Sequence, residues 1–139
     1  MRKIVLLLGV AVLAFAAVAS ASSSKEIMVG AKLDAMQDHA TGSHGTGTFT
    51  ADVVGKKLTW TLKFSGLTGA ASAAHIHLGA KGKAGNVLIP LCGPCKASMK
   101  GTAAVSAAQL RDIQKGMTYV NVHTAKFPNG EIRGQLATH

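Results

Sequence analysis

Residues 47–64, GTFTADVVGKKLTWTLKF, carry the pattern that decides the fold. Apolar and polar residues alternate in both halves of this stretch, and the apolar ones are Phe49, Ala51, Val53, Leu58, Trp60, Leu62 and Phe64. Strict alternation gives each segment one apolar and one polar face, which is typical of half-buried antiparallel strands. The link VGKK contains Gly55 and is short enough for a hairpin turn. The stretch therefore predicts two antiparallel strands that turn one face toward a core.

Further strand-like segments lie on both sides of this hairpin at a spacing of about ten residues. We expect strands at 26–35, 73–79, 86–91, 98–105, 117–124 and 130–136. One helix is indicated, because Ser106 can cap its start, Gln109 completes a capping box and Gly116 can end it. Many short strands with one helix predict an all-β fold, either an antiparallel β-sandwich or a Greek-key barrel.

The N-terminus has the organisation of a secretory signal peptide. Arg2 and Lys3 precede an apolar run over residues 4–18, and A-x-A cleavage motifs end at Ala19 and Ala21. A membrane anchor is the alternative, but the run is shorter than the roughly 20 residues that a spanning helix needs. We therefore expect export to the periplasm or the extracellular space, with no transmembrane helix in the mature chain.

This interpretation divides the chain into a signal peptide at 1–21, an N-terminal strand and flexible polar loop at 22–46, and a β-domain at 47–139. We expect residues 26–46 to belong to the same fold as the β-domain.

The formal net charge is +9, but the positive residues are thinly spread and the chain has only one Trp and one Tyr. This composition argues against nucleic-acid binding by base stacking. It favours loose attraction to anionic surfaces such as polysaccharide.

Three histidines in strand-like segments are candidate metal ligands. His75 and His77 are separated by one residue, which places both imidazoles on the same face of a strand. His123 can add a third nitrogen for copper or another transition metal. The alternative is that these side chains are only solvated or hydrogen-bonded, since H-x-H alone is a weak motif. For His39 and His44, in a Gly/Ser-rich loop, we expect surface positions.

Other polar residues are expected near His123. Asn121 shares its strand face, and the Pro-Asn-Gly turn at 128–130 can pair the last two strands. That pairing would bring Glu131 or Arg133 beside His123. A carboxylate in this place can orient an imidazole whether or not a metal is bound.

Cys92 and Cys95 have the C-x-x-C spacing of a thioredoxin-type redox centre. Such a centre needs a helix start that lowers the pKa of the first thiol. The sequence that follows, KASMKGTAAV, has no helical period, and no βαβ alternation occurs in the chain. Thiolate binding of a metal is a further alternative, but two cysteines do not complete a four-ligand zinc site. Export and the presence of only two cysteines favour a local disulfide that holds a tight turn.

Three motifs together resemble the CHRD domain, named from the secreted protein chordin and also found in exported bacterial proteins. They are AHIHLGAKGKAG at 74–85, YVNVHT at 119–124 and PNGEIRGQL at 128–136, and the resemblance covers about residues 47 to 136. It implies an all-β, extracytoplasmic domain and defines no activity. The role of chordin in sequestering growth factors is not implied, because the chain lacks chordin's cysteine-rich modules.

The spacing of His75, His77 and His123 also resembles the copper ligands of copper–zinc superoxide dismutases. This likeness covers a few residues only, and the loop that supplies the zinc ligands in those enzymes has no equivalent between Leu78 and Leu91.

Three hypotheses for function follow. The favoured one is a non-catalytic binding or interaction module for an extracytoplasmic protein, a polysaccharide or another surface ligand. The second is a periplasmic or secreted metal-binding protein with a three-histidine copper site, with superoxide-dismutase-like activity as an extension. The third is a thiol–disulfide protein. We assign no catalytic residues, since the sequence lacks a nucleophile motif and a phosphate-binding loop.

Overall fold

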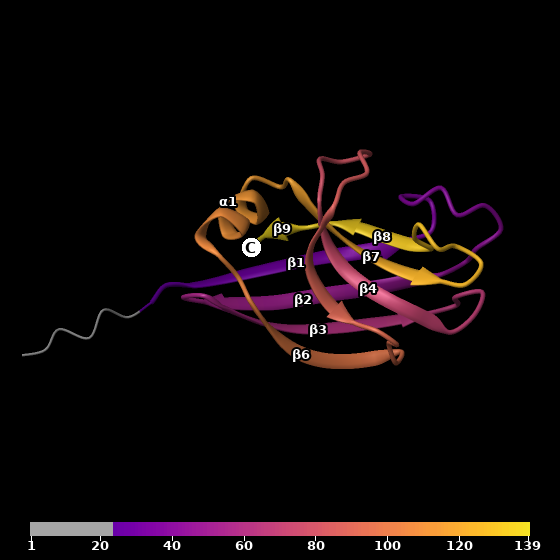
Figure 1. Ribbon diagram of the computed structural model, residues 1–139, viewed down its shortest axis with the longest axis horizontal. Coiled ribbons are helices and arrows are strands. Elements are labelled where there is room, and N and C mark those ends of the chain that lie inside the picture. The colour runs from indigo at the N-terminus through magenta and orange to yellow at the C-terminus, as the bar shows by residue number, and fades with distance from the viewer. Residues whose placement is uncertain (1–23) are drawn as a thin grey trace, which may run out of the picture.

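The computed structural model describes residues 24–139, and the signal peptide with its cleavage sites therefore lies outside the described residues. The strands are β1 (Glu26–Asp34), β2 (Thr46–Val54), β3 (Lys57–Ser65), β4 (Ala71–Leu78), β5 (Val87–Cys92), β6 (Ser98–Ala104), β7 (Thr118–Thr124), β8 (Ile132–Gln135) and β9 (Ala137–Thr138). The helix α1 spans Ala107–Gln114 and lies at one end of the strands (Figure 1). The two-residue strand β9 was not predicted from the sequence.

All the strands belong to one antiparallel sheet with the order β5-β4-β7-β8-β1-β2-β3-β6, and β9 pairs with β1. The two strands at the ends of this order, β5 and β6, follow each other in the chain and lie side by side. The sheet therefore curls into a nearly closed barrel (Figure 1). The predicted all-β class is confirmed, and the barrel is the observed form.

The hairpin predicted from residues 47–64 forms as expected. Every residue of β2 pairs with a residue of β3, and Ala51 lies opposite Trp60. The turn between the strands uses Gly55 at a φ of 61°, a conformation that glycine adopts without strain. The apolar residues of the alternation are buried, except for half-buried Phe64, and the polar residues between them face outward or lie at the surface. This hairpin and β1 form one wall of the core.

The strand β7 differs from the hairpin because every one of its residues is buried. Val120 and Val122 point into the core, and the polar residues between them face the other side of the sheet. The loop before β2, the loop between β4 and β5 and the turn before β8 supply the contacts that cover this polar face. The barrel thus contains a buried polar layer next to its apolar core.

The turn between β5 and β6 is cross-linked by a disulfide between Cys92 and Cys95, whose Cα atoms are 5.4 Å apart. The Cys95 N–H donates to the carbonyl of Ala71, and the Phe64 N–H donates to the carbonyl of Ala97. These bonds attach the turn to the start of β4 and to the end of β3. A strand follows the second cysteine, where a thioredoxin-type centre would have a helix.

The helix α1 begins with the predicted capping box. The Ser106 hydroxyl accepts from the Gln109 N–H at 3.2 Å, and the Gln109 side chain accepts from the Ser106 N–H at 2.8 Å. The Gln109 amide also donates to the Leu88 carbonyl of β5, and Ile113 is fully buried. The capped helix is therefore fixed to the end of the barrel.

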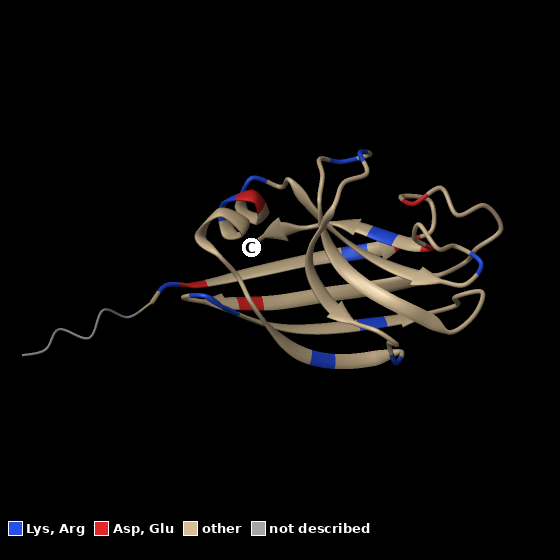
Figure 2. Ribbon diagram, in the orientation of Figure 1, with Lys and Arg blue, Asp and Glu red and all other residues tan. Residues whose placement is uncertain are grey.

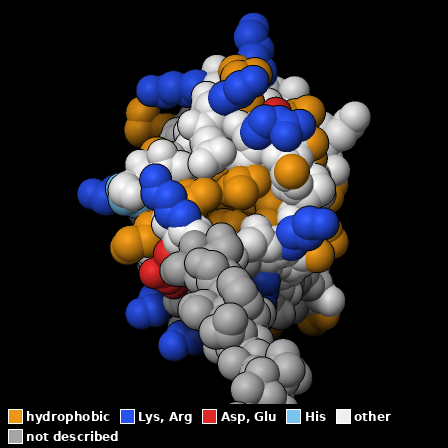
Figure 3. Space-filling model, turned by 90° about the vertical axis from the view of Figure 1, so that its left-hand side faces the viewer, with side chains coloured by type: hydrophobic (Ala, Val, Ile, Leu, Met, Phe, Trp, Pro, Cys, Tyr) orange, Lys and Arg blue, Asp and Glu red, His pale blue; other side chains and the backbone are white. Residues whose placement is uncertain are grey.

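Charge is distributed over the whole surface. Lys and Arg occur on strands and loops alike, and Asp and Glu are fewer (Figure 2). The end of the barrel that carries α1 shows apolar side chains with Lys and Arg at intervals around them (Figure 3). This arrangement agrees with the thinly spread charge expected from the sequence.

Candidate metal centre

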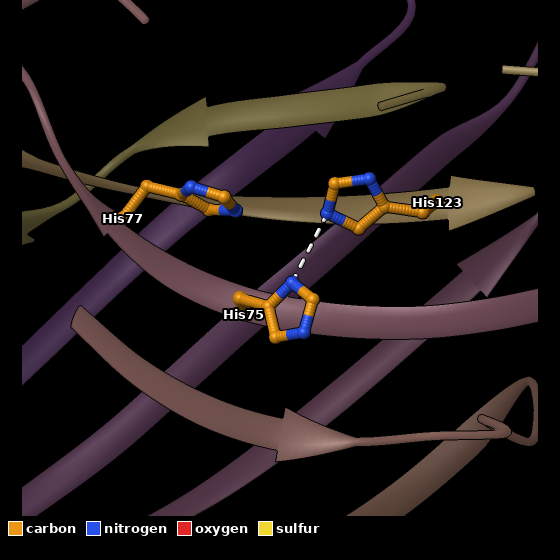
Figure 4. Close-up of side chains that lie close together, drawn as sticks. All are labelled: His75, His77 and His123. Atoms are coloured by element: carbon orange, nitrogen blue, oxygen red, sulfur yellow. Dashed lines mark hydrogen bonds between the residues drawn. The ribbon is translucent and has the colours of Figure 1, made fainter. Parts of the chain in front are cut away.

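The three predicted histidines lie together on the buried polar face of β4 and β7, and we call His75, His77 and His123 the histidine triad. His75 and His77 share a face of β4, as their spacing predicts. The antiparallel register places Asn121 opposite His75 and places Ala73 opposite His123, so His123 is diagonal to His75. The three rings turn toward one another in the space above these two strands (Figure 4).

The ring nitrogens of the histidine triad are close enough to share one ion. One nitrogen from each ring lies within 4.8 Å of the other two. The shortest separation, 3.1 Å, joins His75 Nδ1 to His123 Nε2 (Figure 4). Metal–nitrogen bonds of about 2.0–2.1 Å require ligand nitrogens no more than about 4.1 Å apart. The His75–His123 pair already meets this limit, and no pair of nitrogens exceeds it by more than about 1 Å.

Backbone carbonyls fix the orientation of two of these rings. His77 Nδ1 lies 3.0 Å from the carbonyl oxygen of Gly85, and His123 Nδ1 lies 3.0 Å from that of Pro128. A carbonyl only accepts a hydrogen bond, so both Nδ1 atoms carry the proton and both Nε2 atoms present a lone pair. His77 Nε2 is buried and has no hydrogen-bond partner among residues 24–139. The same carbonyl-to-imidazole bonds orient histidine ligands in metalloproteins.

Burial keeps the histidine triad neutral. Loss of solvent lowers the pKa of His75, and the neighbouring imidazoles of His123 and His77 lower it further. Burial also lowers the pKa of His77 and of His123, although the carbonyls of Gly85 and Pro128 partly oppose this shift. A histidine must lose its proton to bind a metal, so these environments favour the ligating form.

Gly85, in the loop between β4 and β5, contacts both His77 of β4 and Tyr119 of β7 on one side of the site. The ring of His77 stacks on that of Tyr119, with 5.0 Å between centroids and 7° between planes. The Gly85 N–H donates to the Tyr119 hydroxyl at 3.2 Å, while its carbonyl accepts from His77. A Cβ on Gly85 would collide with the carbonyl oxygen of Leu78. Only glycine therefore allows this loop to reach His77.

Arg133 and Glu131 lie in the buried polar layer, but their hydrogen bonds go to residues outside the histidine triad. The Arg133 guanidinium lies 3.3 Å from the centre of the Tyr119 ring and donates to the Ala80 carbonyl at 3.1 Å. The turn before β8 brings the Pro128 carbonyl to His123, and the hydrogen bonds of Glu131 and Arg133 go to other residues. Backbone oxygens therefore orient the imidazoles of His77 and His123.

The Glu131 carboxylate instead joins three segments of the chain. It accepts from the Ser43 hydroxyl at 2.7 Å, the Thr124 hydroxyl at 2.6 Å, and the Thr68 N–H and hydroxyl at 2.7 and 2.9 Å. Burial alone would raise its pKa, but these four hydrogen bonds outweigh that effect and lower it. Glu131 is thus an ionised, fully buried carboxylate that connects two loops to β7.

Asp38 is a member of the site that the sequence did not reveal. It comes from the loop before β2, and its carboxylate lies with the Asn121 amide against Gly130, where a Cβ would collide with both. Burial raises the pKa of Asp38, and the Arg133 charge, the Asn121 amide and His77 partly offset the rise. The Asp38 carboxylate is close enough to the Asn121 amide for a hydrogen bond that lowers its pKa, but Asp38 Oδ2 itself has no partner of hydrogen-bond geometry within residues 24–139. His39 and His44 are exposed, as expected.

A comparison with protein families finds one match, which covers most of the described residues. The family model described as CHRD domain matches residues 28–136. The chain belongs to the CHRD domain family. The match to the CHRD domain begins earlier than the motifs that suggested it, so it includes most of β1 and the loop that carries Asp38. Neither the curated proteins nor the solved structures contain a match to this CHRD domain.

Within residues 24–139 no helix has the length and apolar character needed to cross a bilayer.

Proposed function

We propose that this CHRD domain is an exported metal-binding module, in which the histidine triad holds one copper ion or a similar transition metal. The observation that carries the proposal is the convergence of one nitrogen from each ring within 4.8 Å. The proposal takes up the second of the three hypotheses drawn from the sequence, the three-histidine metal site, in place of the favoured interaction module.

A metal explains the histidine triad better than hydrogen bonding alone. The contact between His75 and His123 can be a hydrogen bond, but it leaves His77 Nε2 without a partner. His77 is only 8% exposed. A buried acceptor without a partner costs roughly 1–3 kcal/mol. A bound ion would use this lone pair together with those of the other two rings.

The donor atoms favour copper among the common metals. Neutral imidazoles suit Cu, Zn, Ni and Fe, and Cu²⁺ binds most tightly to such donors in the first-row series. Both cysteines are in the disulfide, so neither offers a thiolate. His75 is only partly buried, so one of the three rings is in contact with solvent. An ion held in this way keeps a coordination position free of protein ligands.

The test is copper and zinc titration of the untagged chain, compared with a His75→Ala/His77→Ala variant. The exposed loop residue His44 supplies the matched control, His44→Ala. We expect wild type and control to bind one equivalent of copper, with paramagnetic resonance showing imidazole nitrogens. The double variant should bind at least about 100-fold more weakly, since even indirect partners of a metal ligand contribute about 10–100-fold. Equal binding by wild type and the double variant, or no binding by wild type, would overturn the proposal.

A further inference from the structure

Three buried polar atoms lack hydrogen-bond partners in the region around the histidine triad. They are His77 Nε2, Asp38 Oδ2 and Asn121 Oδ1, and none has a partner within residues 24–139. Asn121 is only 2% exposed. Buried polar groups are almost always satisfied, so unpartnered atoms in one region need a common explanation.

The strand register places Asn121 at the centre of this region. It lies directly opposite His75 on β4, is diagonal to His77 and is two residues from His123 on β7. All four side chains therefore share one face. Asp38 reaches the same place from the loop above, because its Oδ2 and the Asn121 amide lie against the same Cα, that of Gly130.

The chemistry of the three atoms is the same, because each offers a lone pair and no hydrogen. The Asn121 amide nitrogen donates to the Asn129 carbonyl at 3.3 Å, which assigns Oδ1 as the free acceptor. A carboxylate oxygen also only accepts while it is ionised. Each atom therefore needs a hydrogen-bond donor or, in the case of the His77 imidazole nitrogen, a metal ion.

We propose that a water molecule is the fourth ligand of the ion, and that Asp38 and Asn121 hold it by accepting its two hydrogens. The proposal rests on the metal site proposed above. One ion and one water then satisfy all three atoms, since the water oxygen binds the ion and each hydrogen has one acceptor. Asp38 acts through the water, because the cluster of ligand atoms within 4.8 Å contains the three histidines and no carboxylate.

This arrangement makes Asp38 and Asn121 positioning residues for an exchangeable ligand. A metal lowers the pKa of a bound water. A carboxylate that accepts its hydrogen bond stabilises the water in one orientation. A small molecule that displaces the water would meet the same acceptors and would therefore need hydrogens to offer them.

The experiment compares copper binding by wild type, Asp38→Ala and Asp38→Asn, with Asp52→Ala on the exposed face of β2 as the matched control. We expect both Asp38 variants to keep one copper and its imidazole signals and to bind it about 10–100-fold more weakly. The coupling of exchangeable protons to copper, measured in H₂O and D₂O, should change in both variants and stay unchanged in the control. The Asp38→Asn variant keeps the shape of the side chain. If Asp38→Ala does not fold, the comparison of Asp38→Asn with wild type is the test.

The outcomes separate this proposal from the one on which it rests. Wild-type affinity and unchanged exchangeable-proton coupling in both Asp38 variants would overturn the water ligand, while the three-histidine site would stand. Absence of copper binding by wild type would overturn both. Loss of imidazole signals in Asp38→Asn would also overturn this proposal, because Asp38 would then be shaping the histidines themselves.

Discussion

Replacement of Glu131 tests whether one buried carboxylate fastens the loops around the site. In Glu131→Gln the amide oxygen can replace Oε1, which accepts from the Ser43 hydroxyl and the Thr68 N–H. The amide nitrogen then faces the hydroxyls of Thr68 and Thr124, which can rotate and accept. Glutamine can therefore keep the arrangement of the four hydrogen bonds and removes only the negative charge of the carboxylate. In Glu131→Ala all four hydrogen bonds are lost.

The magnitude follows from these four bonds. A hydrogen bond to a charged group contributes ~1.5–3 kcal/mol and a neutral one about 1 kcal/mol, so glutamine weakens each bond by roughly 1 kcal/mol. Relief from burying a charge offsets part of this loss. We expect the free energy of unfolding to fall by about 1–2 kcal/mol in Glu131→Gln. We expect a fall of about 3–5 kcal/mol in Glu131→Ala, because four neutral donors lose their acceptor at up to roughly 1–3 kcal/mol each, and water at exposed Thr68 recovers part of that cost.

The assay is urea unfolding from about pH 7 to about pH 3. Hydrogen bonding lowers the folded-state pKa of Glu131 below its ordinary value of 4.5. The unfolded chain then takes up the proton first, so this contribution is present above about pH 4.5 and is lost as the pH falls through the folded-state pKa. The difference between wild type and Glu131→Gln should shrink over this acidic range. A constant difference, or a Glu131→Ala variant within about 1 kcal/mol of wild type, would refute the reasoning.

Four further predictions concern the site and the barrel. Gly85→Ala should weaken copper binding and lower the melting temperature, because the new Cβ collides with the Leu78 carbonyl and moves the carbonyl that holds His77; calorimetric titration and thermal unfolding measure both. Cys92→Ser/Cys95→Ser should lower stability in urea by about 2 kcal/mol, the chain-entropy value for such a short loop. Because burial lowers the pKa values of the histidine triad, the metal-free protein should lose stability as the pH falls below the ordinary histidine value of 6.5. Free copper at about 100 times its Kd should stabilise the protein by ~2.7 kcal/mol at neutral pH, and a chelator should reverse this.

Patterns of side chains were sufficient to predict the local structure. The alternation around Trp60 marked both strands of a hairpin, because a half-buried strand requires that period. The capping box of Ser106 and Gln109 marked the start of the helix, since both partners are close in sequence. The H-x-H spacing placed His75 and His77 on one face for the same geometric reason. Each of these predictions depends on residues within a few positions of one another.

Features made by distant segments or by the backbone were not predictable. Gly85 and Pro128 orient the imidazoles through backbone carbonyl oxygens. Every residue has such an oxygen, so the residue types at these positions did not indicate the contacts. Asp38 is one polar residue in a polar loop, and only the path of that loop over β7 brings it to Asn121. Two of the three partner residues of the Glu131 carboxylate, Ser43 and Thr68, come from segments far away in the chain, so no local sequence pattern indicated them.

The short turn between β5 and β6 has a consequence for association with other chains. These strands end the sheet order, so each has a row of backbone groups without a ladder partner, the usual template for edge-to-edge aggregation. The cross-linked turn holds the two edges beside each other and limits the access of another chain. Pro90 in β5 lacks an N–H, and exposed Lys100 places a charge on β6, and both features discourage the addition of a foreign strand. The disulfide of the C-x-x-C motif thus helps to protect the two edge strands, β5 and β6, from pairing with another chain.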